Sequence, residues 1–287
     1  MSYHMYADDT QLYDSATLDQ ITPLIDKIQM CISAVNCWMM ANKLKLNKDK
    51  TEVIPCSTAP KLRLLNVASM CIDGDTVPLS GKVKNLGVYL DRDLSMEAQV
   101  NHLCKISYLE MRRISQMRSY LDIDSTKTLV SAYILSRIDY CNSLLAGLPN
   151  VKINKLQYVQ NNAARLVLKR PKREHVIPML RELHWLPVQA RIEYKLAVLC
   201  FKAQTNVTPC YIKDLLIPLS PTTTVTLRSA EDNLLTTPRT NLRTYGDRAF
   251  TFKGPDVWNT LSQELRDMTN FDTFKIKLKT FLFQKYL

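Results

Sequence analysis

Two adjacent carboxylates, Asp8 and Asp9, form the sharpest chemical feature of the sequence. They lie between two short apolar and aromatic runs, 3–6 and 10–13, and Asp favours tight turns, so the pattern predicts a β-hairpin over residues 3–13. Paired carboxylates on such a turn are hard oxygen ligands that suit Mg²⁺. Polymerases and nucleases use two such ions to activate an attacking oxygen and to stabilise the leaving one. An ordinary polar turn is the alternative.

Positive charge is concentrated in the middle of the chain. The net formal charge of +11 divides into −2 over residues 1–100, +10 over residues 101–204 and +3 over residues 205–287. This distribution favours a polyanionic partner, because each phosphate that Lys or Arg neutralises releases a bound counterion. A solvated helical surface that happens to be basic is the alternative.

The composition is that of a folded chain rich in helix. Of its 287 residues, 46% are hydrophobic, which is enough for a core and for about two domains. Only 6 glycines are present, and this disfavours glycine-rich phosphate loops, collagen and propellers.

The sequence contains no recognisable membrane span or signal peptide. No apolar run reaches the ~18 residues that a span needs, and the first residues lack a basic and then apolar segment. We therefore expect an intracellular protein, cytoplasmic or nuclear, without a membrane partner. The 8 cysteines include no Cys-x-x-Cys pair, and the 4 histidines complete no zinc spacing. Reduced thiols are expected rather than a disulfide framework.

Short strands and one long helix are expected over the first 94 residues. The helix begins at Thr22-Pro23, where Thr22 is the expected N-cap and Pro23 the first helical residue. Its apolar stripe at helical spacing consists of Leu24, Ile28, Ile32, Val35 and Met39. The further strands expected are 51–56, 69–72, 76–79 and 82–90, with a turn at Asp73-Gly74.

Helical patterns dominate from residue 95 onward. The helices expected are 95–119, 125–142, 152–169, 174–184 and 188–205. A stretch rich in Thr and Pro, 206–250, is expected to be irregular. Two short helices near 256–266 and 272–285 follow, so the predicted fold class is α+β.

Several sequence blocks extend the Asp-Asp motif in a fixed order. Tyr6-Ala7-Asp8-Asp9 is followed by Asn47-Lys48-Asp49-Lys50-Thr51 and then by Asn85-Leu86-Gly87-Val88. This order and spacing resemble the reverse transcriptase of non-LTR (LINE-type) retrotransposons. Later blocks resemble the thumb of that enzyme and the carboxyl-terminal end of such reading frames, so the likeness covers nearly the whole chain. These later blocks are 139–142, 156–165, 183–188, 246–250 and 254–259.

The resemblance implies a partial palm hairpin and sheet over residues 1–94. It places a mainly helical, basic, thumb-like nucleic-acid-binding region over residues 95–205 and an irregular carboxyl-terminal extension over residues 206–287. The implied activity is RNA-directed DNA polymerisation by two-metal nucleotidyl transfer, with Mg²⁺ as cofactor. The implied partner is nucleic acid, an RNA template paired with a DNA primer.

The resemblance also assigns catalytic roles. Asp8 and Asp9 match the catalytic pair and would be metal ligands, with Asp8 favoured as the ligand of both ions. Lys50 matches a lysine near the nucleotide phosphates, where it would offset charge or protonate the pyrophosphate leaving group. A plain surface lysine is the alternative for Lys50.

Three residues match positions that bind nucleotide or primer. Tyr6 would lie beside the incoming nucleotide or the primer end, and its alternative is a strand aromatic that packs beneath the turn. Leu86 and Gly87 would let the primer backbone approach closely, since Gly has no Cβ. A bulge in a strand is the alternative for this pair.

A basic cluster is expected to contact nucleic-acid phosphates. Arg165 and Lys169 would share one helix face at a spacing of four residues. For the cluster 169–173, a nuclear-import patch is the alternative. The expected phosphate contacts are Arg165, Lys169, Arg170, Lys172 and Arg173. The tryptophans Trp38, Trp185 and Trp258 are expected in the core rather than stacked on bases.

The match departs from the family at the start of the chain, where only 5 residues precede Tyr6. In the family, a further strand with a third catalytic Asp, and the fingers that bind nucleotide, lie upstream of the Asp-Asp turn. We therefore expect the 287-residue chain alone to be catalytically inactive, because small misplacements of the reacting groups cost much rate. A non-catalytic nucleic-acid-binding module, a remnant without function and a helical scaffold for protein partners are the alternatives to a polymerase fragment.

Overall fold

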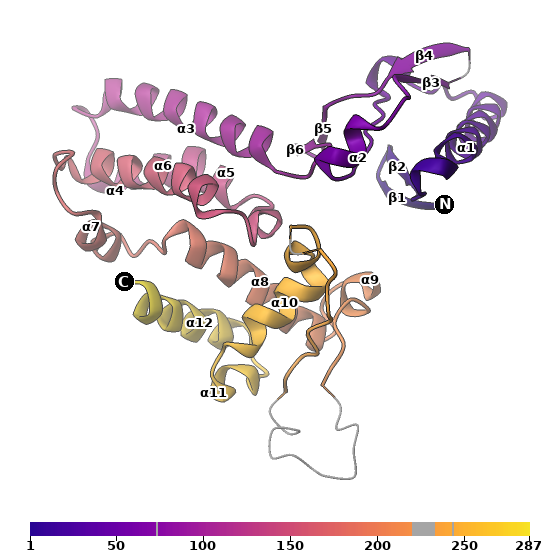
Figure 1. Ribbon diagram of the computed structural model, residues 1–287. Coiled ribbons are helices and arrows are strands. Elements are labelled where there is room, and N and C mark those ends of the chain that lie inside the picture. The colour runs from indigo at the N-terminus through magenta and orange to yellow at the C-terminus, as the bar shows by residue number, and fades with distance from the viewer. Residues whose placement is uncertain (73, 220–232, 243) are drawn as a thin grey trace, which may run out of the picture. The chain divides into compact units, whose positions relative to one another are not determined.

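The computed structural model describes residues 1–72, 74–219, 233–242 and 244–287, with the backbone alone at Lys48. Small antiparallel hairpins and many helices make up these residues, which confirms the predicted α+β class. The chain forms two compact units, Met1–Gln99 and Val100–Leu287, each described by itself below (Figure 1).

The first unit contains three separate two-stranded antiparallel sheets within the described residues. The strand pairs are β1 (Ser2–Tyr6) with β2 (Asp9–Tyr13), β3 (Ser69–Ile72) with β4 (Asp75–Pro78), and β5 (Lys82–Asn85) with β6 (Val88–Asp91). The predicted hairpin over 3–13 and the strands near 69–72 and 76–79 are confirmed. Of the predicted turn, Asp73 lies outside the described residues, and Gly74 has a φ of +81°.

Two strand predictions are wrong. Instead of a strand over 51–56, Val53 alone forms a parallel bridge, to Leu79; Pro55 lacks the N–H that a continued ladder needs. Instead of one strand over 82–90, the chain reverses at Leu86-Gly87 to form the β5–β6 hairpin. Both turn residues have positive φ, 44° and 85°, as expected for a two-residue hairpin loop.

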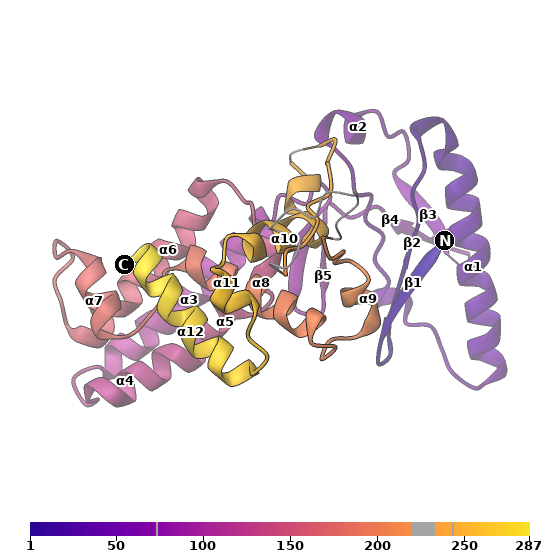
Figure 2. The same cartoon turned by 90° about the horizontal axis from the view of Figure 1, so that it is seen from below.

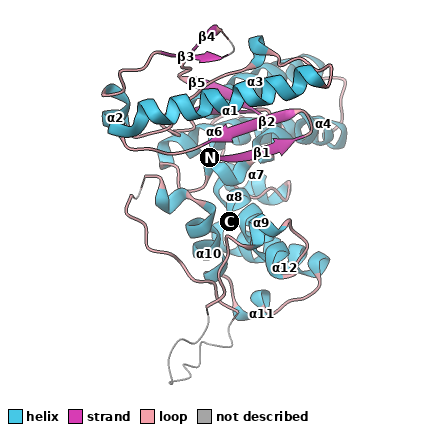
Figure 3. Cartoon of the chain, turned by 90° about the vertical axis from the view of Figure 1, so that its right-hand side faces the viewer, coloured by secondary structure: helices cyan, strands magenta, loops and turns pink. Residues whose placement is uncertain are grey.

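Helix α1 (Ile21–Ala41) confirms the long helix of the first unit, and it lies beside the β1–β2 hairpin (Figures 2 and 3). The helix begins one residue before Thr22, directly after the 3₁₀ turn η1 (Leu18–Gln20), so Thr22 is not its N-cap. Asn36 is the one buried residue of α1, and the predicted stripe is half-buried at best. Trp38 is 62% exposed, so the expectation that it packs in the core is wrong.

In the second unit, two long helices lie side by side and run in the same direction. They are α3 (Glu97–Met117) and α6 (Asn150–Leu168). Lys155 donates a hydrogen bond to Asn101 and Asn162 donates one to Tyr108, so the contacts advance together along both helices. The side chain of Arg118, just after α3, reaches the carboxyl end of α6.

The expected helix over 125–142 is a continuous helical run with a π-helical turn. It comprises α4 (Ile123–Val130), η3 (Ser131–Leu135) and α5 (Ser136–Asp139). Asp122 caps its start, because its carboxylate accepts a hydrogen bond from the Ser125 N–H at 2.7 Å. The run ends three residues earlier than expected, where Cys141 takes a left-handed φ of 51° and the 3₁₀ turn η4 (Asn142–Leu145) begins.

Helix α8 (Val188–Gln204) is the centre of the second unit (Figure 1). It packs against α6, α10 (Phe250–Asn259) and α12 (Phe271–Tyr286). Its Phe201 ring stacks on Phe274 at 4.3 Å between centroids. Helices α10 and α12 therefore share a core with α8. The division predicted at residue 205 does not coincide with the observed boundary between units. The short elements are η2 (Lys48–Lys50), α2 (Ala59–Arg63), α7 (Val176–Glu182), α9 (Cys210–Lys213), η6 (Gly246–Arg248) and α11 (Gln263–Arg266).

The eight cysteines all lie in described residues and are free thiols, but they differ greatly in accessibility. Cys200 is 0% exposed within the α8 core, and burial raises the pKa of its thiol to about 12. We expect a thiol-specific disulfide reagent at pH 8 to label exposed Cys141 and Cys210 in the native protein. Cys200 should react at least about a thousandfold more slowly until the protein unfolds, because the thiolate is the nucleophile. Mass spectrometry of labelled peptides checks this, and equal native rates at Cys200 and Cys210 would contradict the buried position.

Candidate functional site

The Asp-Asp motif lies at the tip of the β1–β2 hairpin. Tyr6 pairs with Asp9, and Ala7 and Asp8 form the turn between them. Ala7 has a φ of +54°, a left-handed conformation that costs a residue with a Cβ about 1 kcal/mol. Both carboxylates are exposed to solvent. The predicted turn therefore presents two accessible hard oxygen ligands.

These carboxylates fit a divalent cation only in part. Mg²⁺ is commonly held by one or two carboxylates together with water or substrate phosphates. Asp8 and Asp9 could supply these carboxylate ligands. Across residues 1–72, 74–219, 233–242 and 244–287, no group of three or more His, Cys, Asp or Glu side chains is placed to hold a metal ion.

A hydrogen bond joins the Asp-Asp hairpin to the hairpin that carries Leu86 and Gly87. Gln11 Nε2 donates to Asn85 Oδ1 at 2.7 Å, between residues 74 apart in sequence. Gln11 and Asp9 lie on one face of β2, since alternate strand residues share a face, and Asn85 directly precedes Leu86. This hydrogen bond therefore joins the hairpin that carries Asp8 and Asp9 to the hairpin that carries Leu86 and Gly87.

Leu86 and Gly87 form the tip of the β5–β6 hairpin rather than part of one strand. Leu86 is half-buried and Gly87 is exposed. The positive φ of Gly87 explains the glycine by turn geometry alone. A close approach by a primer backbone stays a prediction.

Lys50 lies in the turn η2 and is exposed. Asn47 organises this turn: its backbone and side-chain oxygens accept from the Lys50 N–H at 3.2 and 3.3 Å, and its carbonyl also accepts from Thr51 Oγ1 at 2.9 Å. The Asn-x-x-Lys-Thr block is thus explained locally as a side-chain-stabilised turn. Among the described contacts, none joins Lys50 to Asp8 or Asp9.

The predicted phosphate-binding cluster divides into one structural residue and an exposed loop. Arg165 is half-buried in α6 and donates to the Glu174 carbonyl at 3.2 Å. Lys169 follows the end of α6 with a left-handed φ of 53°, so it does not continue the helix face of Arg165 as predicted. The exposed cationic residues of the loop before α7 are Lys169, Arg170, Lys172 and Arg173, of which Arg170 pairs with Glu174.

The remaining predicted aromatic residues are Tyr6, Trp185 and Trp258. Tyr6 is 64% exposed and shares a face with Asp9, so it does not pack beneath the turn. Trp185 and Trp258 are 5% and 1% exposed, which confirms that they belong to the core. Trp258 also donates its indole N–H to the Asn233 carbonyl at 2.8 Å.

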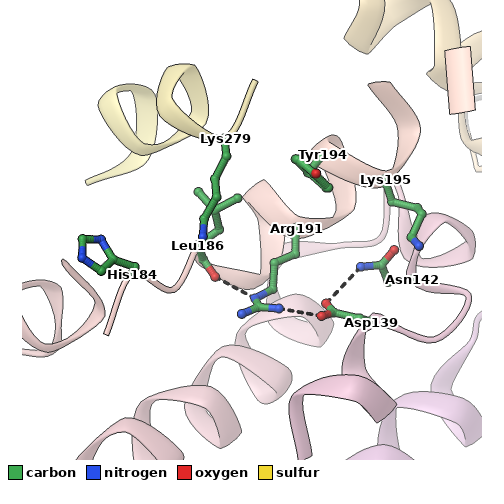
Figure 4. Close-up of a pocket in the computed structure, with 8 residues that line it drawn as sticks. All are labelled: Asp139, Asn142, His184, Leu186, Arg191, Tyr194, Lys195 and Lys279. Carbon is green, nitrogen blue, oxygen red and sulfur yellow. Dashed lines mark hydrogen bonds and ion pairs between the residues drawn. The ribbon is translucent and has the colours of Figure 1, made fainter. Parts of the chain in front are cut away.

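A second polar cluster, which contains none of the predicted site residues, lies around Asp139, Asn142 and Arg191 in the second unit (Figure 4). Its residues come from two blocks noted above, 139–142 and 183–188, and from α8 and α12. Gln157 and Gln160 of α6 secure the intervening turn: Gln157 accepts from the Val188 N–H, and Gln160 donates to the Leu186 carbonyl. The sequence feature that could have indicated this cluster is the presence of polar residues on otherwise apolar helix faces.

Comparison with known proteins gives no match for the chain among family models, curated proteins or solved structures. Among the described residues, no helix is both long and apolar enough to cross a membrane.

Proposed function

We propose that this chain is part of an RNA-directed DNA polymerase of a LINE-type retrotransposon. The Asp8–Asp9 turn would contribute carboxylate ligands for Mg²⁺, which supplies the Lewis acid chemistry of nucleotidyl transfer. The second unit would bind the RNA template–DNA primer duplex. The structural observation that supports the proposal is the Gln11–Asn85 hydrogen bond, because it joins the hairpin with the Asp-Asp turn to the hairpin with the Leu-Gly turn.

The proposed roles of single residues follow from the resemblance to the family. Exposed Tyr6, on the face of Asp9, is available to a nucleotide or a primer end. The Leu86-Gly87 tip is the primer contact, and Lys50 acts on the nucleotide phosphates. The exposed loop residues Lys172 and Arg173 contact the duplex backbone.

A primer-extension assay on an RNA template with Mg²⁺ tests the polymerase proposal. The purified chain is expected to bind the hybrid duplex without sustained incorporation of nucleotides. Incorporation that Asp8→Asn abolishes would establish the polymerase and contradict the expected inactivity. Hybrid binding that Asp8→Asn leaves unchanged, without incorporation, is the signature of a non-catalytic binding module. A chain that binds no hybrid even at low salt fits the remnant instead.

The basic middle of the chain favours that binding module as the second candidate function. Residues 101–204 carry a net charge of +10, and the loop before α7 exposes four cations. Contacts of this kind position a duplex but do not read its sequence.

The salt dependence of binding gives a sharper prediction for the exposed loop. Replacing Lys172 and Arg173 together by Gln should weaken binding of the hybrid and reduce the slope of log K against log salt by about 2, since each lost phosphate contact reduces it by roughly 0.9. Fluorescence anisotropy at several salt concentrations measures the slope. The matched control replaces Lys275 and Lys277, which are paired with Asp272 and Glu264, and should leave the slope unchanged. Equal slopes for the loop variant and the wild-type protein would remove this loop from the interface.

A further inference from the structure

A cavity of about 280 Å³ lies in the second unit, where α8 meets the end of α5, the segment before α8, and α12. Its size is close to the lower end of cavities that take small ligands, roughly 300–1,000 Å³. The polar residues considered below are Asp139, Asn142, Arg191, Lys195 and Lys279 (Figure 4).

The cavity carries an excess of positive charge. Arg191 pairs with Asp139, with 2.6 Å between Nη1 and Oδ2. Lys195 and Lys279 also line the cavity, and the positive charge of Lys195 acts on the same Asp139 carboxylate. Three cations therefore line this concave, partly desolvated place with a single carboxylate among them, which favours an anionic ligand.

The effect of burial and of neighbouring positive charge is clearest at Lys279. Burial lowers the pKa of its ammonium group, and the nearby charges of Arg191 and Lys127 lower it further. Its Nζ lies 5.7 Å from the centroid of the Phe283 ring. An anion bound in the cavity would offset both effects, because an opposite charge within a few ångströms favours the charged form.

Arg191 is held in a fixed orientation by the protein. Its Nε donates to the Leu186 carbonyl at 2.9 Å, and its Nη1 donates to Asp139. Its Nη2 has no acceptor in the described part of the chain. The guanidinium plane is thus preorganised, with one nitrogen left to bind an oxygen of a ligand.

Asn142 adds an unpartnered acceptor. Its side chain is in a residue only 2% exposed, and its Oδ1 is buried without a hydrogen-bond partner among the described residues. Its Nδ2 faces Asp139 at 3.5 Å, and the Lys195 side chain extends toward it in Figure 4. A buried amide oxygen without a hydrogen bond is destabilising, and a hydroxyl group on a ligand would satisfy it.

We propose that this cavity binds a phosphorylated sugar, such as the ribose phosphate of a nucleotide. Phosphate oxygens accept hydrogen bonds from Lys279 and Arg191 Nη2. On the other side of the Arg191–Asp139 pair, a sugar hydroxyl donates to Asn142 Oδ1 and accepts from Lys195 (Figure 4). The inference uses no residue of the Asp-Asp hairpin and does not depend on the polymerase proposal. Its failure and that of the polymerase are therefore distinguishable.

Calorimetric titration of the full chain with AMP and with inorganic phosphate tests the site. AMP is expected to bind more tightly than inorganic phosphate, because only AMP offers the hydroxyl groups. Lys279→Gln and Lys195→Gln should each weaken AMP binding about tenfold, as expected for one charge-assisted hydrogen bond. In the control Lys105→Gln, the charge that is removed is an exposed one on α3, outside the cavity. This variant should bind AMP as the wild type does.

Two results would overturn the site. One is the absence of AMP binding at millimolar concentration to a wild-type protein whose circular dichroism shows it folded. The other is an equal loss of affinity in Lys105→Gln and Lys279→Gln, which would indicate diffuse charge instead of a cavity. Matching melting temperatures of the variants and the wild type exclude misfolding as the cause of lost binding.

Competition identifies the source of the phosphorylated sugar. A 5′-phosphorylated tetranucleotide that displaces AMP, when the unphosphorylated form does not, indicates a strand terminus as the ligand. Displacement by neither indicates a free nucleotide. Both results support the phosphate site, whereas displacement by the unphosphorylated form alone contradicts it.

Discussion

Replacing Arg118 by Met is expected to lower the free energy of unfolding of the second unit by about 3 kcal/mol. Arg118 belongs to the basic middle of the chain, yet it is 7% exposed. Its guanidinium donates to the Leu166 and Val167 carbonyls, at 2.9 and 2.6 Å, and to the Leu121 carbonyl at 2.6 Å.

The position of Leu166 and Val167 explains the size of the effect. Both lie in the last turn of α6, where carbonyl groups have no partner within the helix. A buried cation there satisfies these carbonyls and interacts favourably with the negative end of the helix dipole. Met keeps much of the aliphatic stem but leaves buried carbonyls unpaired.

Guanidinium-induced unfolding, followed by circular dichroism, measures the loss. The stability of Arg118→Lys should fall between those of Arg118→Met and the wild type, since a single ammonium cannot donate to all three carbonyls as the planar guanidinium does. Arg112→Met is the matched control, because Arg112 is exposed on α3 and surface changes cost within about 0.5 kcal/mol. A fully stable Arg118→Met protein with weakened nucleic-acid binding would instead place Arg118 in the interface.

Arg118 also shows what a charge count can and cannot predict. The sequence correctly gives a net charge of +10 over residues 101–204, but it does not separate buried cations from exposed ones. Arg165 is half-buried against the Glu174 carbonyl, whereas Lys172 and Arg173 face solvent. Burial depends on which helices meet, and that is decided by contacts between residues far apart in the chain.

Local signals predicted the elements whose turns have a strong chemical signature. The Asp-Asp hairpin and the amphipathic helices from α3 to α8 follow from turn propensity and apolar spacing. The Leu86-Gly87 turn was missed because Leu at positive φ is unusual, and the alternation on either side resembles one strand. The Gln11–Asn85 hydrogen bond and the cavity around Arg191 could not be predicted, since each joins segments with no local relationship.

Truncation of Phe274 is expected to have the largest effect on stability, a loss of about 3–5 kcal/mol for Phe274→Ala. Phe274 is 0% exposed in α12, where it stacks on Phe201 of α8 at 4.3 Å and lies 6.1 Å from Trp258 of α10. Its ring therefore joins three helices of the core. Removing the ring loses both its burial and its aromatic contacts, and leaves a cavity between these helices.

The matched control is Ile276→Ala, two residues further along the same helix. Ile276 is 70% exposed, so its truncation should change the free energy of unfolding by no more than about 0.5 kcal/mol. Phe274→Leu should cost less than Phe274→Ala, because Leu refills much of the cavity. The variants keep Trp185 and Trp258 as fluorescence probes of denaturant unfolding. A Phe274→Ala protein as stable as Ile276→Ala would show that α12 does not share a core with α8, and it would favour the boundary predicted at residue 205.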